Sequence, residues 1–276
     1  MNLVKNNTPL WASIIAFGED PPLETKVKCG KIRGTSTIVD DFVVDAFILD
    51  QVEEVMNYMR RVFQLSYSIT GKPERDEIWE YPLEAVREVV TNAICHKDYS
   101  SPAQIQIKIF DDKLTIWNPG RLPFGMTIER LMDPAHNSIP RNRLLAMLFY
   151  DVELIENYGS GIQRILEECK RLNFPVPEFK EVEGGFQVIF YKDIYNEENL
   201  TKMGLNERQI KAVMHIKEIG KLNNREYQKK FGVAKATATR DLTTLVEKKI
   251  LYIVGKGKRD IYYLLSEPKM SQKDIE

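Results

Sequence analysis

The sequence predicts an α/β protein whose mixed sheet is covered by helices on one face, followed by a small domain of helices and a hairpin. Three observations predict this. Apolar runs with helical spacing and runs with strand-like alternation are interleaved over residues 49–191, without the regularity of repeated βαβ units. An acidic, Asn-rich stretch follows at 193–200. Beyond it, three helical patterns precede two short apolar runs, at 250–254 and 261–265.

Length and composition exclude several classes of protein. At 276 residues the chain exceeds the usual size of one core, which predicts two domains and room for a short third piece. A hydrophobic content of 43% argues against wholesale disorder. No apolar run approaches the roughly 18 residues of a membrane span, and the N-terminus lacks the features of a signal peptide, so a cytoplasmic location without membrane attachment is expected. The three cysteines form no CxxC pair, which predicts reduced, buried thiols.

The elements of the first domain are expected in the following order. An apolar stretch at 10–17 is followed by a turn and a β-leaning run. A helix over 49–63 and a helix over 82–96, with Pro82 in its first turn, are indicated by apolar residues at helical spacing. Further strands are expected at 64–69, 77–79, 104–110, 113–117 and 185–191, and further helices at 127–132, 141–148 and 162–172.

The helix over 82–96 carries a stripe of polar residues opposite its apolar side. Glu88, Asn92 and His96 are spaced four residues apart, so a helix presents them as one line of side chains. An amide oxygen is a suitable hard ligand for Mg²⁺, and a carboxylate one turn away can orient or deprotonate a water. The stripe alone decides little, because most polar helix faces are simply solvated.

Two glycine-bearing segments follow this helix. Asn118-Pro119-Gly120 ends the strand over 113–117, and Gly159-Ser160-Gly161 directly precedes a helical pattern. A GxG at a helix start exposes backbone N–H groups at the positive end of the helix dipole, which suits phosphate groups. The alternative is an ordinary helix-entry turn.

Four motifs in this order resemble the GHKL, or Bergerat-fold, ATPases, and most closely the RecG-related branch that is labelled helicase or transcriptional regulator. The resemblance covers about residues 45–192. It rests on Glu88-Val89-Val90-Thr91-Asn92-Ala93-Ile94-Cys95-His96-Lys97-Asp98-Tyr99, Trp117-Asn118-Pro119-Gly120-Arg121-Leu122-Pro123, Ser138-Ile139-Pro140-Arg141-Asn142 and Ile155-Glu156-Asn157-Tyr158-Gly159-Ser160-Gly161-Ile162. It implies a Bergerat-type α/β sandwich that binds ATP or ADP with Mg²⁺.

The resemblance also implies roles for individual residues. Glu88 would be the general base, Asn92 would ligate Mg²⁺, and His96 and Lys97 would approach phosphate oxygens. Asn118 and Gly120 lie where the wider family binds adenine through an Asp-x-Gly, Arg141 lies in the expected lid, and Gly159 and Gly161 match the phosphate-binding glycines. Asn118 departs from the family's Asp, and its amide oxygen is a weaker acceptor than a carboxylate. Nucleotide binding is expected, whereas hydrolysis stays open.

A helicase motor is not expected. Motors that separate DNA strands need a P-loop, and the sequence contains no GxxxxGK[ST] motif.

The C-terminal part is basic and has the pattern of a helix-turn-helix. Residues 203–266 contain 14 Lys and Arg against 6 Asp and Glu. Helices are expected over 206–218, 224–231 and 234–248, followed by the hairpin and its basic tip at 255–259. The module resembles winged helix-turn-helix regulators, which implies contacts with double-stranded DNA. The expected DNA-contacting residues are Lys235, Thr237, Thr239, Arg240, Lys256, Lys258 and Arg259. A winged helix used for protein contacts is the alternative.

These observations predict five segments. Residues 1–35 resemble the end of an Alba-like, Schlafen-type domain, most of which is missing. Residues 36–194 form the ATP-binding domain, 195–204 a linker, 205–266 the winged helix and 267–276 a loose tail.

The expected function is that of a nucleotide-responsive transcriptional regulator. An ATP-hydrolysing enzyme that uses Glu88, and a scaffold with vestigial sites, are the alternatives. Winged helices commonly pair on two half-sites, so a homodimer stays open as well.

Overall fold

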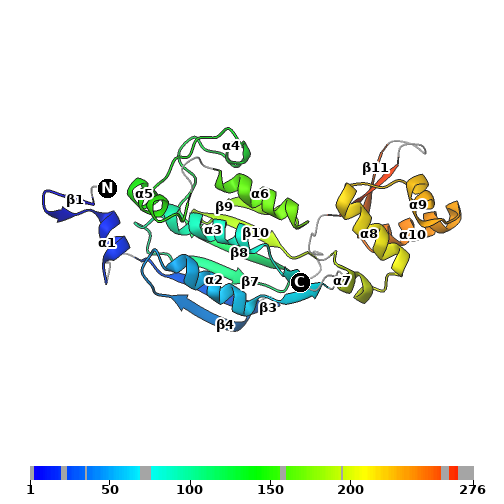
Figure 1. The fold of residues 1–276 in the computed structure, drawn as a ribbon, viewed down its shortest axis with the longest axis horizontal. Helices are drawn as coiled ribbons and strands as arrows, with labels where there is room; N and C mark the ends of the chain where they lie inside the picture. The colour runs from blue at the N-terminus through cyan, green and yellow to red at the C-terminus, as the bar shows by residue number, and fades with distance from the viewer. Residues whose placement is uncertain are drawn as a thin grey trace. The chain divides into compact units, whose positions relative to one another are not determined.

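The computed structural model describes residues 3–19, 24–34, 36–68, 76–155, 160–193, 195–255 and 261–266. The chain divides into two compact units, Met1–Lys192 and Asp193–Glu276 (Figure 1). None of the described helices is both long enough and apolar enough to cross a bilayer.

The first unit is built on a mixed sheet of six strands. In spatial order these are β4 (Thr37–Val44), β3 (Val27–Arg33), β7 (Ile105–Ile109), β8 (Lys113–Pro119), β10 (Gly185–Tyr191) and β9 (Glu178–Val182). Strands β3 and β7 run parallel, and the other neighbouring pairs run antiparallel. The predicted α/β class, with a mixed sheet and helices, is therefore confirmed.

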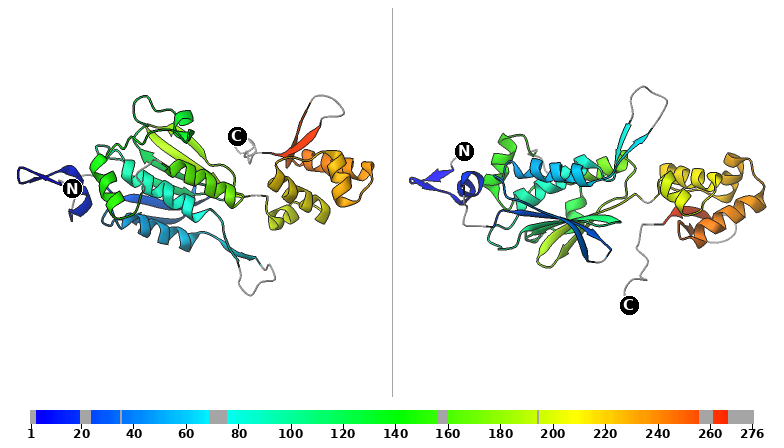
Figure 2. Two further views of the ribbon diagram at one scale, coloured as in Figure 1. Left: turned by 45° about the horizontal axis from the view of Figure 1, so that its top comes forward. Right: turned by 90° about the horizontal axis from the view of Figure 1, so that it is seen from below.

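Three helices cover one face of this sheet: α2 (Gln51–Val62), α3 (Leu83–His96) and α6 (Gly161–Arg171) (Figure 2). Helix α3 lies between the other two and over β8. The predicted apolar side of α3 is buried at Val86, Val90 and Ile94. Its central place also buries Val89 and Cys95, so more of the helix is covered than one amphipathic face would require.

Smaller elements lie around this layer. They are the strand pair β1 (Val4–Lys5) and β2 (Thr8–Pro9), helix α1 (Trp11–Phe17), the pair β5 (Leu65–Ser68) and β6 (Asp76–Trp79), and helices α4 (Ile128–Met132) and α5 (Arg143–Asp151). Cys29, Cys95 and Cys169 are free and buried, as predicted.

The predicted boundary at residue 35 is wrong. Strand β3 pairs with β7 from Val27↔Ile105 to Lys31↔Ile109, so residues 27–33 are an inner strand of the main sheet. Strand β4, which had no strand prediction, forms an edge of the same sheet. Its paired aspartates, Asp40 and Asp41, interrupt the alternation that would have marked it as a strand.

The described residues of the second unit form four helices and a two-stranded sheet. They are α7 (Glu197–Lys202), α8 (Glu207–Ile219), α9 (Asn224–Phe231), α10 (Lys235–Glu247), β11 (Leu251–Val254) and β12 (Tyr262–Leu265). Helices α8 and α9 both begin with an Asn capping box, at Asn206 and Asn223.

The prediction of a linker at 195–204 is wrong. This stretch contains α7 and contributes side chains to the core of the second unit. Tyr195 is 6% exposed and Leu200 is fully buried in the same cluster as Val213 and Leu242. Two apolar side chains in a polar stretch are enough to hold a short helix once α8 lies beside it.

Candidate functional site

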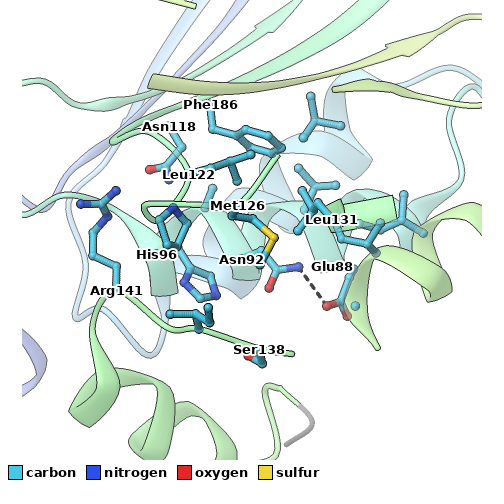
Figure 3. Close-up of a pocket in the computed structure, with 18 of the residues that line it drawn as sticks. Glu88, Asn92, His96, Asn118, Leu122, Met126, Leu131, Ser138, Arg141 and Phe186 are labelled. Carbon is cyan, nitrogen blue, oxygen red and sulfur yellow. Dashed lines mark hydrogen bonds between the residues drawn. The ribbon is translucent and has the colours of Figure 1, made fainter. Parts of the chain in front are cut away.

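The polar stripe of α3 lines a pocket of the first unit. Glu88, Asn92 and His96 occupy successive turns of the helix and all three border the same hollow (Figure 3). The buried residues on the other side of α3 fix the rotation of the helix about its axis. That rotation directs the stripe toward the pocket.

Asn92 and Arg164, among the described residues, both donate to the Glu88 carboxylate. Asn92 Nδ2 donates to Glu88 Oε1 at 3.0 Å, and Arg164 Nη2 on α6 donates to Glu88 Oε2 at 2.7 Å. The Glu88 side chain is 13% exposed and that of Arg164 is 38% exposed, so the carboxylate is mostly buried while the guanidinium keeps contact with solvent. Because the Asn92 amide donates through its nitrogen, its oxygen stays available as an acceptor or a cation ligand.

Gly161 allows α6 to begin directly against this pair. A Cβ at residue 161 would lie 2.3 Å from Glu88 Oε1 and 3.1 Å from Asn92 Nδ2. Any side chain at this position would therefore displace the carboxylate. The predicted helix start after the GxG segment is confirmed, since α6 begins at Gly161.

The opposite wall comes from the sheet. Asn118 on β8 pairs in register with Phe186 on β10, and Ile116 pairs with Val188. All four residues border the pocket, so the sheet contributes an apolar wall with one amide. Asn118 is 7% exposed, and among the described residues no hydrogen-bond partner reaches its Oδ1.

His96 and Arg141 form one end of the pocket. Burial, together with the charge of Arg141, lowers the pKa of His96 from 6.5 to about 4. At neutral pH the ring is therefore uncharged and offers one donor and one acceptor. Arg141 donates to the backbone oxygen of Arg121 and lies 3.8 Å from Asp98 Oδ2.

Gly120 supports this end through its backbone. Its φ of +114° is a conformation that side chains rarely adopt, and a Cβ there would lie 3.0 Å from the Asp98 Cβ and 3.2 Å from the Arg141 guanidinium. The glycine lets β8 end within reach of both residues.

Several pocket residues were not predicted to line the site, although Leu122 and Ser138 lie within the quoted motifs. Leu122, Met126, Leu131 and Ser138 come from the segment between β8 and α5 (Figure 3), and Arg164 comes from the N-terminal part of α6. The segment is irregular apart from α4, so periodicity could not have indicated which of its side chains face the pocket.

The expectation that Lys97 approaches phosphate groups is not met, because Lys97 does not line the pocket. Helix α3 ends at His96, and Lys97 is fully buried with Nζ 3.3 Å from the oxygen of Asp98 and 3.4 Å from that of Ser101. Burial lowers the pKa of its ammonium group. Asn142 holds this turn by donating to the oxygens of Cys95 and Lys97. Gly159 lies outside the described residues.

Four of the predicted DNA-contacting residues are described, and all four lie on α10 in the second unit. Lys235, Thr239 and Arg240 are exposed and Thr237 is half-buried. Asn224 at the start of α9 donates to Thr239 Oγ1 at 3.1 Å. Lys256, Lys258 and Arg259 lie outside the described residues.

A metal held by protein side chains alone is not indicated. Within the described ranges, no group of three or more His, Cys, Asp or Glu side chains is arranged to hold a metal ion. A Mg²⁺ at Asn92 would need further oxygen ligands from phosphate groups or water, as Mg²⁺ commonly has in nucleotide sites.

One family model matches the chain, over residues 102–190. Its description is "Putative ATP-dependent DNA helicase recG C-terminal". The matched stretch contains Asn118, Gly120, Arg141 and Gly161, and it begins after α3. The match supports an ATPase-like, nucleotide-binding domain. Glu88, Asn92 and His96 lie outside it, so their place in the pocket is an observation independent of the match.

The fold also resembles a solved structure, the DIP2311 protein from Corynebacterium diphtheriae. The two chains are 16% identical with a TM-score of 0.61, and the similarity covers 96% of this chain and 56% of that chain. This chain thus spans little more than half the length of that protein. At this identity the likeness supports the fold alone. No curated protein sequence matches the chain.

Proposed function

We propose that the pocket binds ATP or ADP with Mg²⁺. The observation that carries this proposal is the meeting of the α3 stripe, the N-terminus of α6 and the Asn118 wall around one hollow. The apolar wall suits a purine base, and the first N–H groups of α6 suit phosphate oxygens. Asn92, whose amide oxygen is left available by its hydrogen bond to Glu88, would ligate the Mg²⁺.

The nucleotide proposal is tested by calorimetric titration of Mg-ATP into the wild-type protein and Asn92→Ala. We expect binding by the wild type and at least about tenfold weaker binding by the variant, because one metal ligand is lost. Glu84→Ala is the matched control, since Glu84 is an exposed residue in the first turn of the same helix. Equal affinity of the wild type and Asn92→Ala would refute the assignment.

We further propose that the second unit is a winged helix-turn-helix that binds double-stranded DNA. Three features support it: helices α8, α9 and α10 precede the β11–β12 hairpin, α10 exposes Lys235 and Arg240, and residues 203–266 are basic. Lys235→Ala should weaken binding of a duplex and reduce its salt dependence by about one phosphate contact. Lys211→Ala on α8 removes the same charge elsewhere and should have little effect.

Together the two proposals describe a nucleotide-responsive transcriptional regulator. The coupling is tested by fluorescence anisotropy of a labelled duplex with and without Mg-ATP. We expect the DNA affinity to change when the nucleotide is present, and to stop changing in Asn92→Ala. A DNA affinity that is the same in both conditions would reject the coupling while leaving both binding proposals in place.

An ATP-hydrolysing enzyme is the second candidate, because Glu88 lies beside Asn92 at the pocket. Phosphate release that disappears in Glu88→Ala would favour it. The arrangement of Glu88 with Arg164 favours a role in holding the site together, so binding without rapid turnover is the first expectation.

A further inference from the structure

The Asn118 amide is placed to meet the edge of a purine base. It lies in the sheet wall of the pocket among Ile116, Phe186 and Val188, which offer no side-chain hydrogen bonds. Figure 3 shows it beside Phe186 and Leu122, with Glu88 at the other end of the hollow. A base at the Asn118 end would leave the phosphates toward Glu88 and Asn92.

Nothing that the structure describes fixes which way this amide faces. No described residue makes a hydrogen bond to the Asn118 side chain, and its Oδ1 is buried without a partner. A buried amide oxygen without a donor costs about 1–3 kcal/mol, so a ligand that supplies a donor gains from meeting it. The amide can therefore turn to suit its ligand.

The chemistry of an amide differs here from that of a carboxylate. A 6-aminopurine offers a donor at C6 and an acceptor at N1, whereas a 6-oxopurine offers an acceptor at C6 and a donor at N1. A primary amide has one acceptor and donors on the other side, and a half-turn about its terminal torsion exchanges them. Where the C6 group of the base meets residue 118, the amide can accept from a 6-amino group or donate to a 6-oxo group, whereas an ionised carboxylate can only accept.

We propose that this site accepts 6-oxopurine nucleotides as well as 6-aminopurine nucleotides, and that Asn118 is the specificity-determining residue. This rests on the nucleotide site proposed above. The neutral amide sets no preference between the two base edges, and the other sheet residues of the pocket, Ile116, Phe186 and Val188, offer no polar side chain to the base.

The test measures the affinities of Mg-ATP and Mg-ITP, which carries hypoxanthine, for the wild type and for Asn118→Asp. In the wild type the two dissociation constants should agree within about fivefold. In Asn118→Asp the ratio of the ITP constant to the ATP constant should rise by at least about tenfold, because a carboxylate that meets the C6 group accepts from a 6-amino group but is repelled by a 6-oxo oxygen. The ratio cancels any general effect of the added charge on both triphosphates.

Each outcome decides something. If the wild type binds ATP but binds ITP more than about thirtyfold more weakly, the inference fails while the nucleotide site stands. If the ratio in Asn118→Asp equals that of the wild type, Asn118 is not the determinant. If neither triphosphate binds the wild type, the proposed nucleotide site itself fails. Should Asn118→Asp not fold, Asn118→Ser keeps a donor and an acceptor at this position and should retain a ratio close to that of the wild type.

Discussion

Arg164 Nη2 on α6 lies 2.7 Å from Glu88 Oε2 on α3, and this ion pair joins the two helices that flank the pocket. The other Glu88 oxygen accepts from Asn92. The carboxylate thus links a residue of its own helix to the neighbouring helix.

Removing Arg164 should destabilise the first unit. In Arg164→Met the carboxylate of Glu88, 13% exposed, loses its charged partner, while Arg164 itself is 38% exposed and partly screened by solvent. We expect a loss of about 1 kcal/mol in the free energy of unfolding. Urea unfolding measures it. Arg171→Met is the control, because Arg171 pairs with Glu168 on the same helix but is 66% exposed. A loss of the same size in both variants would contradict the buried-pair account.

Adding a methyl group at residue 161 should damage the nucleotide site. In Gly161→Ala the Cβ would meet Glu88 Oε1 at 2.3 Å, so α6 or the carboxylate must move. We expect Mg-ATP affinity to fall by at least about tenfold, since both the Asn92 orientation and the α6 N-terminus are disturbed. Gly30→Ala is the control, because its Cβ would make only an ordinary contact with the Asp40 oxygen at 3.5 Å. Unchanged binding by Gly161→Ala would show that the close approach is unimportant.

The stability of the first unit should depend on the titration of His96. Burial, together with the Arg141 charge, lowers the pKa of His96 from 6.5 to about 4. Between these values the unfolded chain takes up a proton that the folded protein does not, so stability is complete above the unfolded value and falls as the pH drops.

The measurement is urea unfolding at about pH 7.5 and about pH 5. His96→Gln should lose about 2 kcal/mol less than the wild type over this interval, from about 1.4 kcal/mol per pH unit. Equal losses in the wild type and His96→Gln would mean that His96 is not responsible.

Asp241 should be essential to the second unit. Its carboxylate is 3% exposed and accepts from Arg208 Nε at 2.6 Å and from Tyr227 OH at 2.9 Å. Burial alone would raise the pKa of Asp241, but the two hydrogen bonds outweigh it and the pKa is lowered. The carboxylate joins α10 to α8 and α9, so its loss leaves a cation and a hydroxyl without their acceptor.

We expect Asp241→Ala to lower the free energy of unfolding of the second unit by about 3 kcal/mol. Tyr227→Phe removes one hydrogen bond and should cost about 1 kcal/mol. Thermal unfolding followed by circular dichroism measures both. A cost for Asp241→Ala no larger than that for Tyr227→Phe would show that the Arg208 contact contributes little.

The sequence by itself determined the elements whose signals are local. The 3.6-residue period aligns Glu88, Asn92 and His96 on one edge of α3 wherever that helix lies, so their shared direction followed from spacing alone. The alternation of apolar and polar residues predicted strands β7 and β8. The excess of Lys and Arg after residue 203 can be counted in the sequence directly. The helix start at Gly161 followed from the GxG segment.

Only the tertiary structure decided what depends on distant parts of the chain. The parallel pairing of β3 with β7 joins residues separated by about eighty positions, which no local period encodes. Helix α7 exists because Tyr195 and Leu200 find a core in the elements after them. Lys97 turns inward because α3 ends one residue earlier, and Arg164 meets Glu88 because α6 packs against α3. The direction of a side chain follows from its own helix, whereas its partner depends on which elements are packed together.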